Sequence, residues 1–179
     1  MSVSSTILVG RIGQLFWMRV DGRGTFQNSV EVKRCFQSVI AEGTKDFVID
    51  LERCPAMDST FLGTLTGAAL NLRESRGGGL SILNANERNQ TLLTELGLHH
   101  ILDLDVEGTA WLIERKKVSA ELARCEVQAK PVCQEEQARQ VLEAHEALAE
   151  LNAENEFRFR DVIQFLQDDL ASKAKGVEA

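Results

Sequence analysis

The residues best placed for chemistry lie in the segment from residue 50 to residue 63, which links an apolar run to a helical pattern. Asp58 in this segment comes directly before two hydroxylic residues, Ser59 and Thr60. An aspartate at the N-cap accepts hydrogen bonds from the free backbone N–H groups of the first helical turn. Ser59 then takes the first helical position, with its side chain pointing outward. We therefore expect an exposed serine at the amino end of a helix.

A serine in that position is well suited to hold a phosphate, because free N–H groups and the helix dipole both favour added negative charge. Phosphorylation adds about −1.5 to −2 charges, here beside Asp58. A surface that binds a protein while neutral and apolar would then repel it. Ser59 is thus a candidate switch for protein binding. The alternative is that Asp58, Ser59 and Thr60 form only a helix-capping sequence.

The other candidates for chemistry are weaker. The glycines at 77–79 do not lead from a strand into a helix as a nucleotide-binding loop does, so they predict a turn. Ser59 lacks the G-x-S-x-G setting of a hydrolase nucleophile. His99, His100 and His145 are poor candidates for a catalytic triad, and the four cysteines lack the spacing of a metal site, which indicates reduced thiols. We expect no enzyme activity, no catalytic residue, no metal and no cofactor.

Strands and helices alternate around the candidate serine. Apolar runs predict strands at 7–9, 15–20, 47–51, 80–83 and 101–104. Helical spacing predicts one helix with Asn28 or Ser29 as cap, a second that includes residues 61–75, and a third after Asn84 or Asn86. Such alternation favours an α/β fold with a mixed, mostly parallel sheet and helices packed on it, opened by an antiparallel hairpin. In open α/β sheets, binding sites lie at the carboxyl ends of strands. The Ser59 segment follows the strand at 47–51 and lies at such an end.

Charge separates the chain into two parts. Residues 1–117 carry 13 Lys and Arg against 14 Asp and Glu, whereas residues 118–179 carry 7 against 13. We therefore predict an α/β domain at 1–117 and an acidic helical extension at 118–179. The absence of a basic patch argues against nucleic acid as a partner. No apolar stretch reaches the length of a membrane span and no signal pattern opens the chain, so we expect a cytoplasmic protein that does not bind membranes.

The extension has helical character with a break at 129–131 and a resumption near Cys133. Two rows of mostly apolar residues recur in sevens: Val141, Leu148, Asn155 and Val162, and Ala144, Leu151, Arg158 and Phe165. The polar members predict either one bent helix, as in a coiled coil, or two helices with a break near 152–155. The apolar stripe could form a homodimer, cover the Ser59 surface as an internal inhibitor, or bind a separate protein. Nothing in the sequence selects among these roles.

Over about residues 5–115, the chain resembles the STAS domain of anti-sigma factor antagonists. The shared features are Asp50 at the end of an apolar strand, the motif at 58–63, the triple-glycine turn and the glycine and leucine at 97–98. The family motif is Asp-Ser-(Ser/Thr)-Gly-Leu-Gly, and this chain departs from it at one position, where Phe61 replaces the first glycine. Phe61 could be a docking anchor or could turn inward to fill the core.

The resemblance implies a protein-binding module in signal transduction and transcription regulation. Family members bind an anti-sigma factor that is a serine kinase; the kinase phosphorylates the motif serine, and a serine phosphatase reverses the step. For this chain the resemblance implies phosphorylation of Ser59 and a partner surface made by Asp58, Ser59, Thr60, Phe61, Leu62 and Gly63. The alternative is a constitutive STAS scaffold in a signalling complex, in which Ser59 is never modified.

Overall fold

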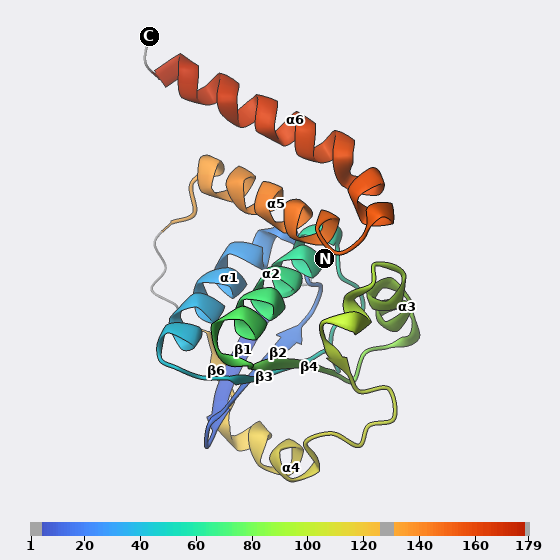
Figure 1. Cartoon of the computed structure of the whole chain (residues 1–179). Helices are drawn as coiled ribbons and strands as arrows, with labels where there is room; N and C mark the ends of the chain where they lie inside the picture. Colours follow the sequence, from blue (N-terminus) through green and yellow to red (C-terminus); the bar gives the residue numbers. More distant parts are fainter. Residues whose placement is uncertain (1–4, 126–130, 178–179) are drawn as a thin grey trace.

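The structure is a computed structural model that describes residues 5–125 and 131–177. Within these residues, six strands form one mixed sheet in the order β5-β4-β3-β2-β1-β6. Figure 1 shows this sheet below the helices that cover one of its faces. Strands β2 to β5 run parallel, and β1 is antiparallel to both of its neighbours. The strands are β1 (Thr6–Ile12), β2 (Leu15–Asp21), β3 (Asp46–Asp50), β4 (Gly79–Leu83), β5 (Asp103–Leu104) and β6 (Ala123–Arg124).

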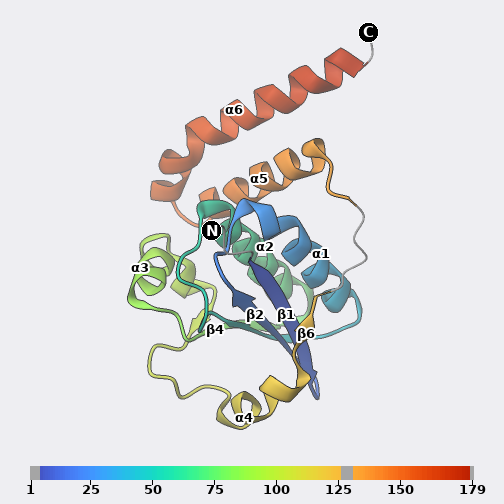
Figure 2. The same ribbon diagram turned by 180° about the vertical axis from the view of Figure 1, so that it is seen from behind.

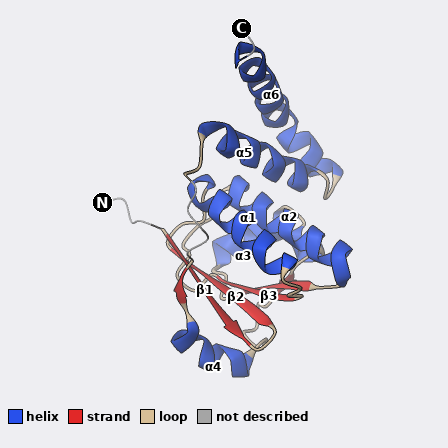
Figure 3. Ribbon diagram, turned by 90° about the vertical axis from the view of Figure 1, so that its left-hand side faces the viewer, coloured by secondary structure: helices blue, strands red, loops and turns tan. Residues whose placement is uncertain are grey.

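Helices cover both faces of the sheet (Figure 3). Helices α1 and α2 lie on one face and α4 on the other, while α5 forms a further layer on top of α1 and α2 (Figure 3). The helices are α1 (Phe26–Ala41), α2 (Ser59–Arg76), α3 (Glu87–Glu95), α4 (Leu112–Glu121), α5 (Gln134–Ala149) and α6 (Ala153–Val177), with a short 3₁₀ turn, η1 (Leu98–His100). The expected mixed α/β sheet with packed helices and a helical extension is confirmed.

The predicted strands form for the reasons that their sequences indicate. Phe47, Val48 and Ile49 in β3 are fully buried, because β3 lies between two parallel neighbours and helices cover its faces. The β1–β2 hairpin closes at Gly13, whose φ of 61° suits a tight reversal between antiparallel strands.

The beginning of α1 differs from the prediction. The N-cap is Thr25, and Asn28 lies at the third helical position, where its side chain accepts a hydrogen bond from the Thr25 backbone N–H (2.9 Å). Asn28 is thus one half of a capping box and not the cap itself, because its side chain reaches back toward the preceding residue. The third helix begins as expected after Asn86, and Gly97 follows it with φ 77°.

The sheet continues past the boundary predicted near residue 118. Helix α4 spans that position, and β6 pairs with β1 at Leu8 and Val9 (Figure 2). The sheet domain therefore extends through residue 124, and the change in composition precedes the structural boundary. The break predicted at 129–131 lies partly outside the described residues, and α5 resumes with Cys133 as its N-cap.

The extension forms two helices, which agrees with the second of the two predicted arrangements. Asn155, which interrupts the apolar row, is fully buried, and its side-chain amide donates to the backbone carbonyls of Leu96 (2.8 Å) and Leu148 (2.9 Å). This polar side chain therefore ties the start of α6 to α5 and to the sheet domain. No helix in the described part of the chain is apolar over a length sufficient to cross a membrane.

Candidate functional site

Asp58 joins the beginnings of two helices. One carboxylate oxygen accepts a hydrogen bond from the backbone N–H of Phe61 (2.8 Å), which caps α2. The other accepts from the backbone N–H of Phe26 (2.9 Å), the first residue of α1. The predicted cap is confirmed, and Ser59 is the first residue of α2 as expected.

We expect Asp58→Ala to destabilise the fold by about 1–2 kcal/mol, because it removes the acceptor for both helix starts. Asp58→Asn is the matched control, since the amide keeps one oxygen for capping. In urea denaturation, the unfolding midpoint of Asp58→Asn should lie between those of the parent protein and Asp58→Ala. Equal midpoints for Asp58→Ala and the parent protein would contradict this role.

The expectation of an exposed serine is corrected by the structure. The side chain of Ser59 is half-buried, and its Oγ lies 3.0 Å from Nε2 of His145 on α5. His145 is 5% exposed, and its ring meets the ring of Phe159 edge-on at 5.3 Å between centroids. His145 lies 86 positions from Ser59 in the chain. Because no local pattern links such distant residues, sequence reasoning did not connect them.

The motif residues after Ser59 point into the protein. Phe61 is fully buried, and the side chains of Thr60 and Leu62 are 5% and 2% exposed. A Cβ built on Gly24 would lie 2.7 Å from the Phe61 ring, so the ring packs directly against the Gly24 backbone. Phe61 therefore fills the core and is not available as a docking anchor in this structure.

Gly63, the last residue of the motif, lies directly under α5. A Cβ at this position would overlap the backbone carbonyl of Ala144. The family's motif glycine therefore serves here as the point where the backbones of α2 and α5 approach each other. Of the six predicted surface residues, Asp58 and Ser59 keep part of their area exposed.

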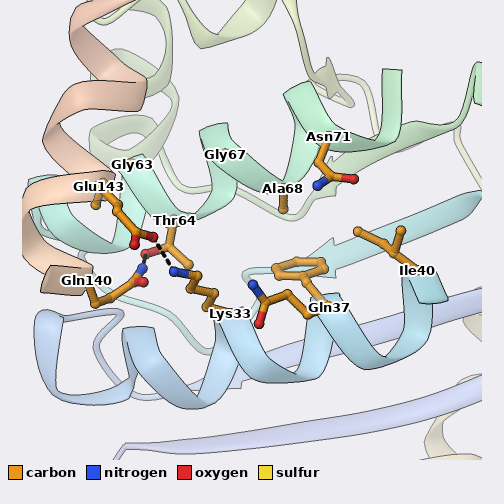
Figure 4. Close-up of a pocket in the computed structure, with 12 residues that line it drawn as sticks. Lys33, Gln37, Ile40, Gly63, Thr64, Gly67, Ala68, Asn71, Gln140 and Glu143 are labelled. Carbon is orange, nitrogen blue, oxygen red and sulfur yellow. Dashed lines mark hydrogen bonds and ion pairs between the residues drawn. The ribbon is translucent and has the colours of Figure 1, made fainter. Parts of the chain in front are cut away.

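A cavity of about 230 Å³ lies beside this contact, between α1, α2 and α5 (Figure 4). At one end, Lys33 pairs with Glu143, and the side-chain amide of Gln140 donates to Thr64 Oγ1 (2.9 Å). Neither Ser59 nor His145 lines this cavity.

Asp50 closes β3 and holds the loop that leads to the motif. Its fully buried carboxylate accepts hydrogen bonds from Arg19 Nε (2.8 Å), from the Asn84 side chain (2.8 Å) and from the backbone N–H of Glu52 (3.1 Å). A buried carboxylate with this many donors is structurally satisfied. Asp50 therefore positions the loop and is not free for acid–base chemistry.

The STAS domain family matches residues 7–126. This chain belongs to the STAS domain family. Similar solved structures include an anti-sigma factor antagonist from Mycobacterium paratuberculosis (17% identity, TM-score 0.54, covering 68% of this chain and 98% of that one) and unphosphorylated SpoIIAA (16%, 0.50, 62% and 97%). A candidate anti-sigma factor antagonist from Thermotoga maritima gives 16% identity and a TM-score of 0.52, covering 63% of this chain and 93% of that one. A search of curated proteins found no match.

These similarities show a STAS fold that anti-sigma factor antagonists share. The family match ends at residue 126, so α5 and α6 follow the matched region of the STAS domain. The contacts of Ser59 with His145 and of Gly63 with Ala144 therefore join the family's fold to an extension outside the matched region.

Proposed function

We propose that this STAS domain is a protein-binding module of the anti-sigma factor antagonist type, switched by phosphorylation of Ser59. The observation that carries the proposal is the position of Ser59 as the first residue of α2, directly after the Asp58 cap, within a STAS fold. Its partner is an anti-sigma factor with serine kinase activity, and a serine phosphatase restores the binding form. The module acts by binding and carries no catalytic residues of its own.

The electrostatics of the position support a switch. Ser59 lies at the positive end of the α2 dipole, which favours the added negative charge of a phosphate, while the Phe61 N–H of the same turn is already bound by the Asp58 cap. The same phosphate places added charge beside Asp58 on the surface that the partner would contact, so the bound state pays a like-charge and desolvation cost. Binding is therefore lost while the phosphorylated domain stays folded.

Incubation of the full chain with ATP and a cytosolic extract of its source should add phosphate at Ser59, read by peptide mapping with mass spectrometry. Ser59→Ala should abolish the signal, and Thr60→Ala should leave it, because the Thr60 side chain is buried. Phosphate elsewhere, or none, would contradict the switch. Absence of phosphate together with self-association would instead support the constitutive scaffold, with a homodimer through the C-terminal helices.

A further inference from the structure

Helix α5 lies across the first turns of α2, which carry the motif. Three contacts define this seat: Ser59 with His145, Gly63 with Ala144, and Thr64 with Gln140. The first two of these α2 residues belong to the motif and the third follows it directly, and the partners on α5 are spaced so that they lie on one face of that helix. The contact is therefore a helix-on-helix interface, centred on the surface assigned to a partner.

The hydrogen-bond pattern shows that α5 contacts the hydroxyl group of Ser59 directly. Nδ1 of His145 lies 2.7 Å from the backbone carbonyl of Val141. A carbonyl only accepts, so Nδ1 carries a proton and donates to it. Nε2, on the other side of the ring, forms the hydrogen bond with the Ser59 hydroxyl. A phosphoryl donor would have to approach an oxygen that faces a buried imidazole on α5.

The interface combines strong and weak features. Leu148 is fully buried in the main core, which favours the docked position. The ion pairs Lys33–Glu143 and Arg34–Glu136 are partly exposed, and such pairs contribute little to stability. Within the described part of the chain, two buried acceptors of the extension, Gln140 Oε1 and Asn155 Oδ1, have no hydrogen-bond partner.

A buried acceptor without a donor destabilises the state in which it is buried, because it has lost its hydrogen bond to water. The docked state of the extension is therefore weaker than its buried apolar area alone implies. A competing protein surface that satisfies these groups, or releases them to water, could displace α5 from α2. Helix α5 therefore covers the Ser59 surface in this structure, and the acceptors without donors make it easier to displace.

We propose that α5 and α6 form an internal cover of the Ser59 surface, which a partner or kinase reaches only after α5 leaves α2. This inference rests on the proposed function in one respect, the kinase that would phosphorylate Ser59; the covering of Ser59 by α5 does not depend on it. Of the roles open to the extension, this one is supported by contacts within a single chain. It makes the module self-inhibited, so partner binding must compete with an intramolecular helix.

A first experiment measures how accessible the side chain at position 59 is to a small reagent, with no partner protein present. Full-length protein carrying Ser59→Cys and Cys133→Ser is treated with iodoacetamide, and alkylation at position 59 is timed by peptide mass mapping. The other cysteines, Cys35, Cys54 and Cys125, are buried. Burial raises the pKa of Cys54, and a hydrogen bond with Cys125, together with burial, raises that of Cys35, so these thiols react slowly.

Two substitutions on α5 open the cover in this background. Leu148→Asp places a charge in the core, and Ala144→Leu enlarges a buried side chain at the residue whose backbone contacts Gly63. Either should raise the alkylation rate at position 59 at least tenfold, while Phe165→Asp, at a site on α6 that is 69% exposed, should leave it unchanged. Circular dichroism selects the variants that stay folded. Equal rates in the folded opening variants and the control would overturn the cover.

A second experiment locks the cover in place. A Cβ built on Gly67 lies 4.0 Å from Cβ of Ala147, within the range of about 3.5–4.5 Å that disulfides require. Gly67→Cys with Ala147→Cys, in a Cys133→Ser background, should form a disulfide under mild oxidation. Absence of that disulfide would contradict the seating of α5 on α2.

The locked protein is then incubated with labelled ATP and a dialysed cytosolic extract. Phosphorylation at Ser59 should fall at least tenfold and return with dithiothreitol, whereas Gly67→Ser with Ala147→Ser should respond to neither oxidant nor reductant. Equal phosphorylation of the locked and reduced forms would overturn the cover while supporting the switch. Absence of phosphate in every form would count against the proposed function, and the alkylation rates would still decide on the cover.

Discussion

Gly63→Ala is expected to loosen α5 from α2 while the sheet domain stays folded. The added methyl group would overlap the backbone carbonyl of Ala144, and a backbone atom cannot rotate away as a side chain can. Overpacking of this kind costs about 1–3 kcal/mol. The least costly relief is a shift of α5, because the position of α2 is fixed by its packing on the sheet.

Gly67→Ala is the matched control, one helical turn further along α2. A Cβ there meets only Cβ of Ala147, at 4.0 Å, which is ordinary van der Waals contact. Alanine in a helix interior is favoured over glycine by about 0.8–1.0 kcal/mol. We therefore expect Gly67→Ala to be neutral or stabilising. Without α5, the same helix propensity would stabilise Gly63→Ala as well.

Amide hydrogen exchange of residues 134–149 measures this difference directly. A loss of about 1.4 kcal/mol in docking corresponds to tenfold faster exchange through opening, so Gly63→Ala should accelerate exchange in α5 by roughly tenfold or more. Exchange in β3 should stay as in the parent protein. Unchanged protection of α5 in Gly63→Ala would mean that α5 does not rest on this glycine.

The fold could be predicted from the sequence because its signals are local. The apolar run of β3 and the Asp58 cap each depend on residues that are close together in the sequence, and both form as expected. Other features depend on contacts between distant residues. The exposure of Ser59 is decided by His145, and the boundary of the sheet domain is decided by the pairing of β6 with β1. No local periodicity carries information of that kind.

The replacement of the motif glycine by Phe61 is another feature that depends on a distant residue. A phenylalanine in the first helical turn is compatible with an exposed anchor or with a core position, and the choice depends on what faces it. Here the facing residue is Gly24, which also bridges to the motif loop: its carbonyl accepts from the Asp58 N–H (2.9 Å). Space at Gly24 is therefore what permits a phenylalanine at position 61.

Gly24→Ala should test this pairing with a large effect on stability. The new methyl group would lie 2.7–2.9 Å from three atoms of the Phe61 ring, and the ring is fully buried and cannot swing into solvent. We expect a loss of about 1–3 kcal/mol from overpacking, measured by urea denaturation. Because Gly24 also contacts the Asp58 backbone, a shift there would displace the start of α2 and with it Ser59.

A double-mutant cycle separates the ring contact from other effects of the substitution. Phe61→Ala alone should cost about 3–5 kcal/mol, as large core truncations do. In that background, Gly24→Ala should cost little, because the ring that opposes the methyl group is gone. The coupling energy should then nearly equal the cost of Gly24→Ala in the parent protein. Additive costs would show that Gly24 is needed for the loop backbone and that Phe61 occupies its place independently of it.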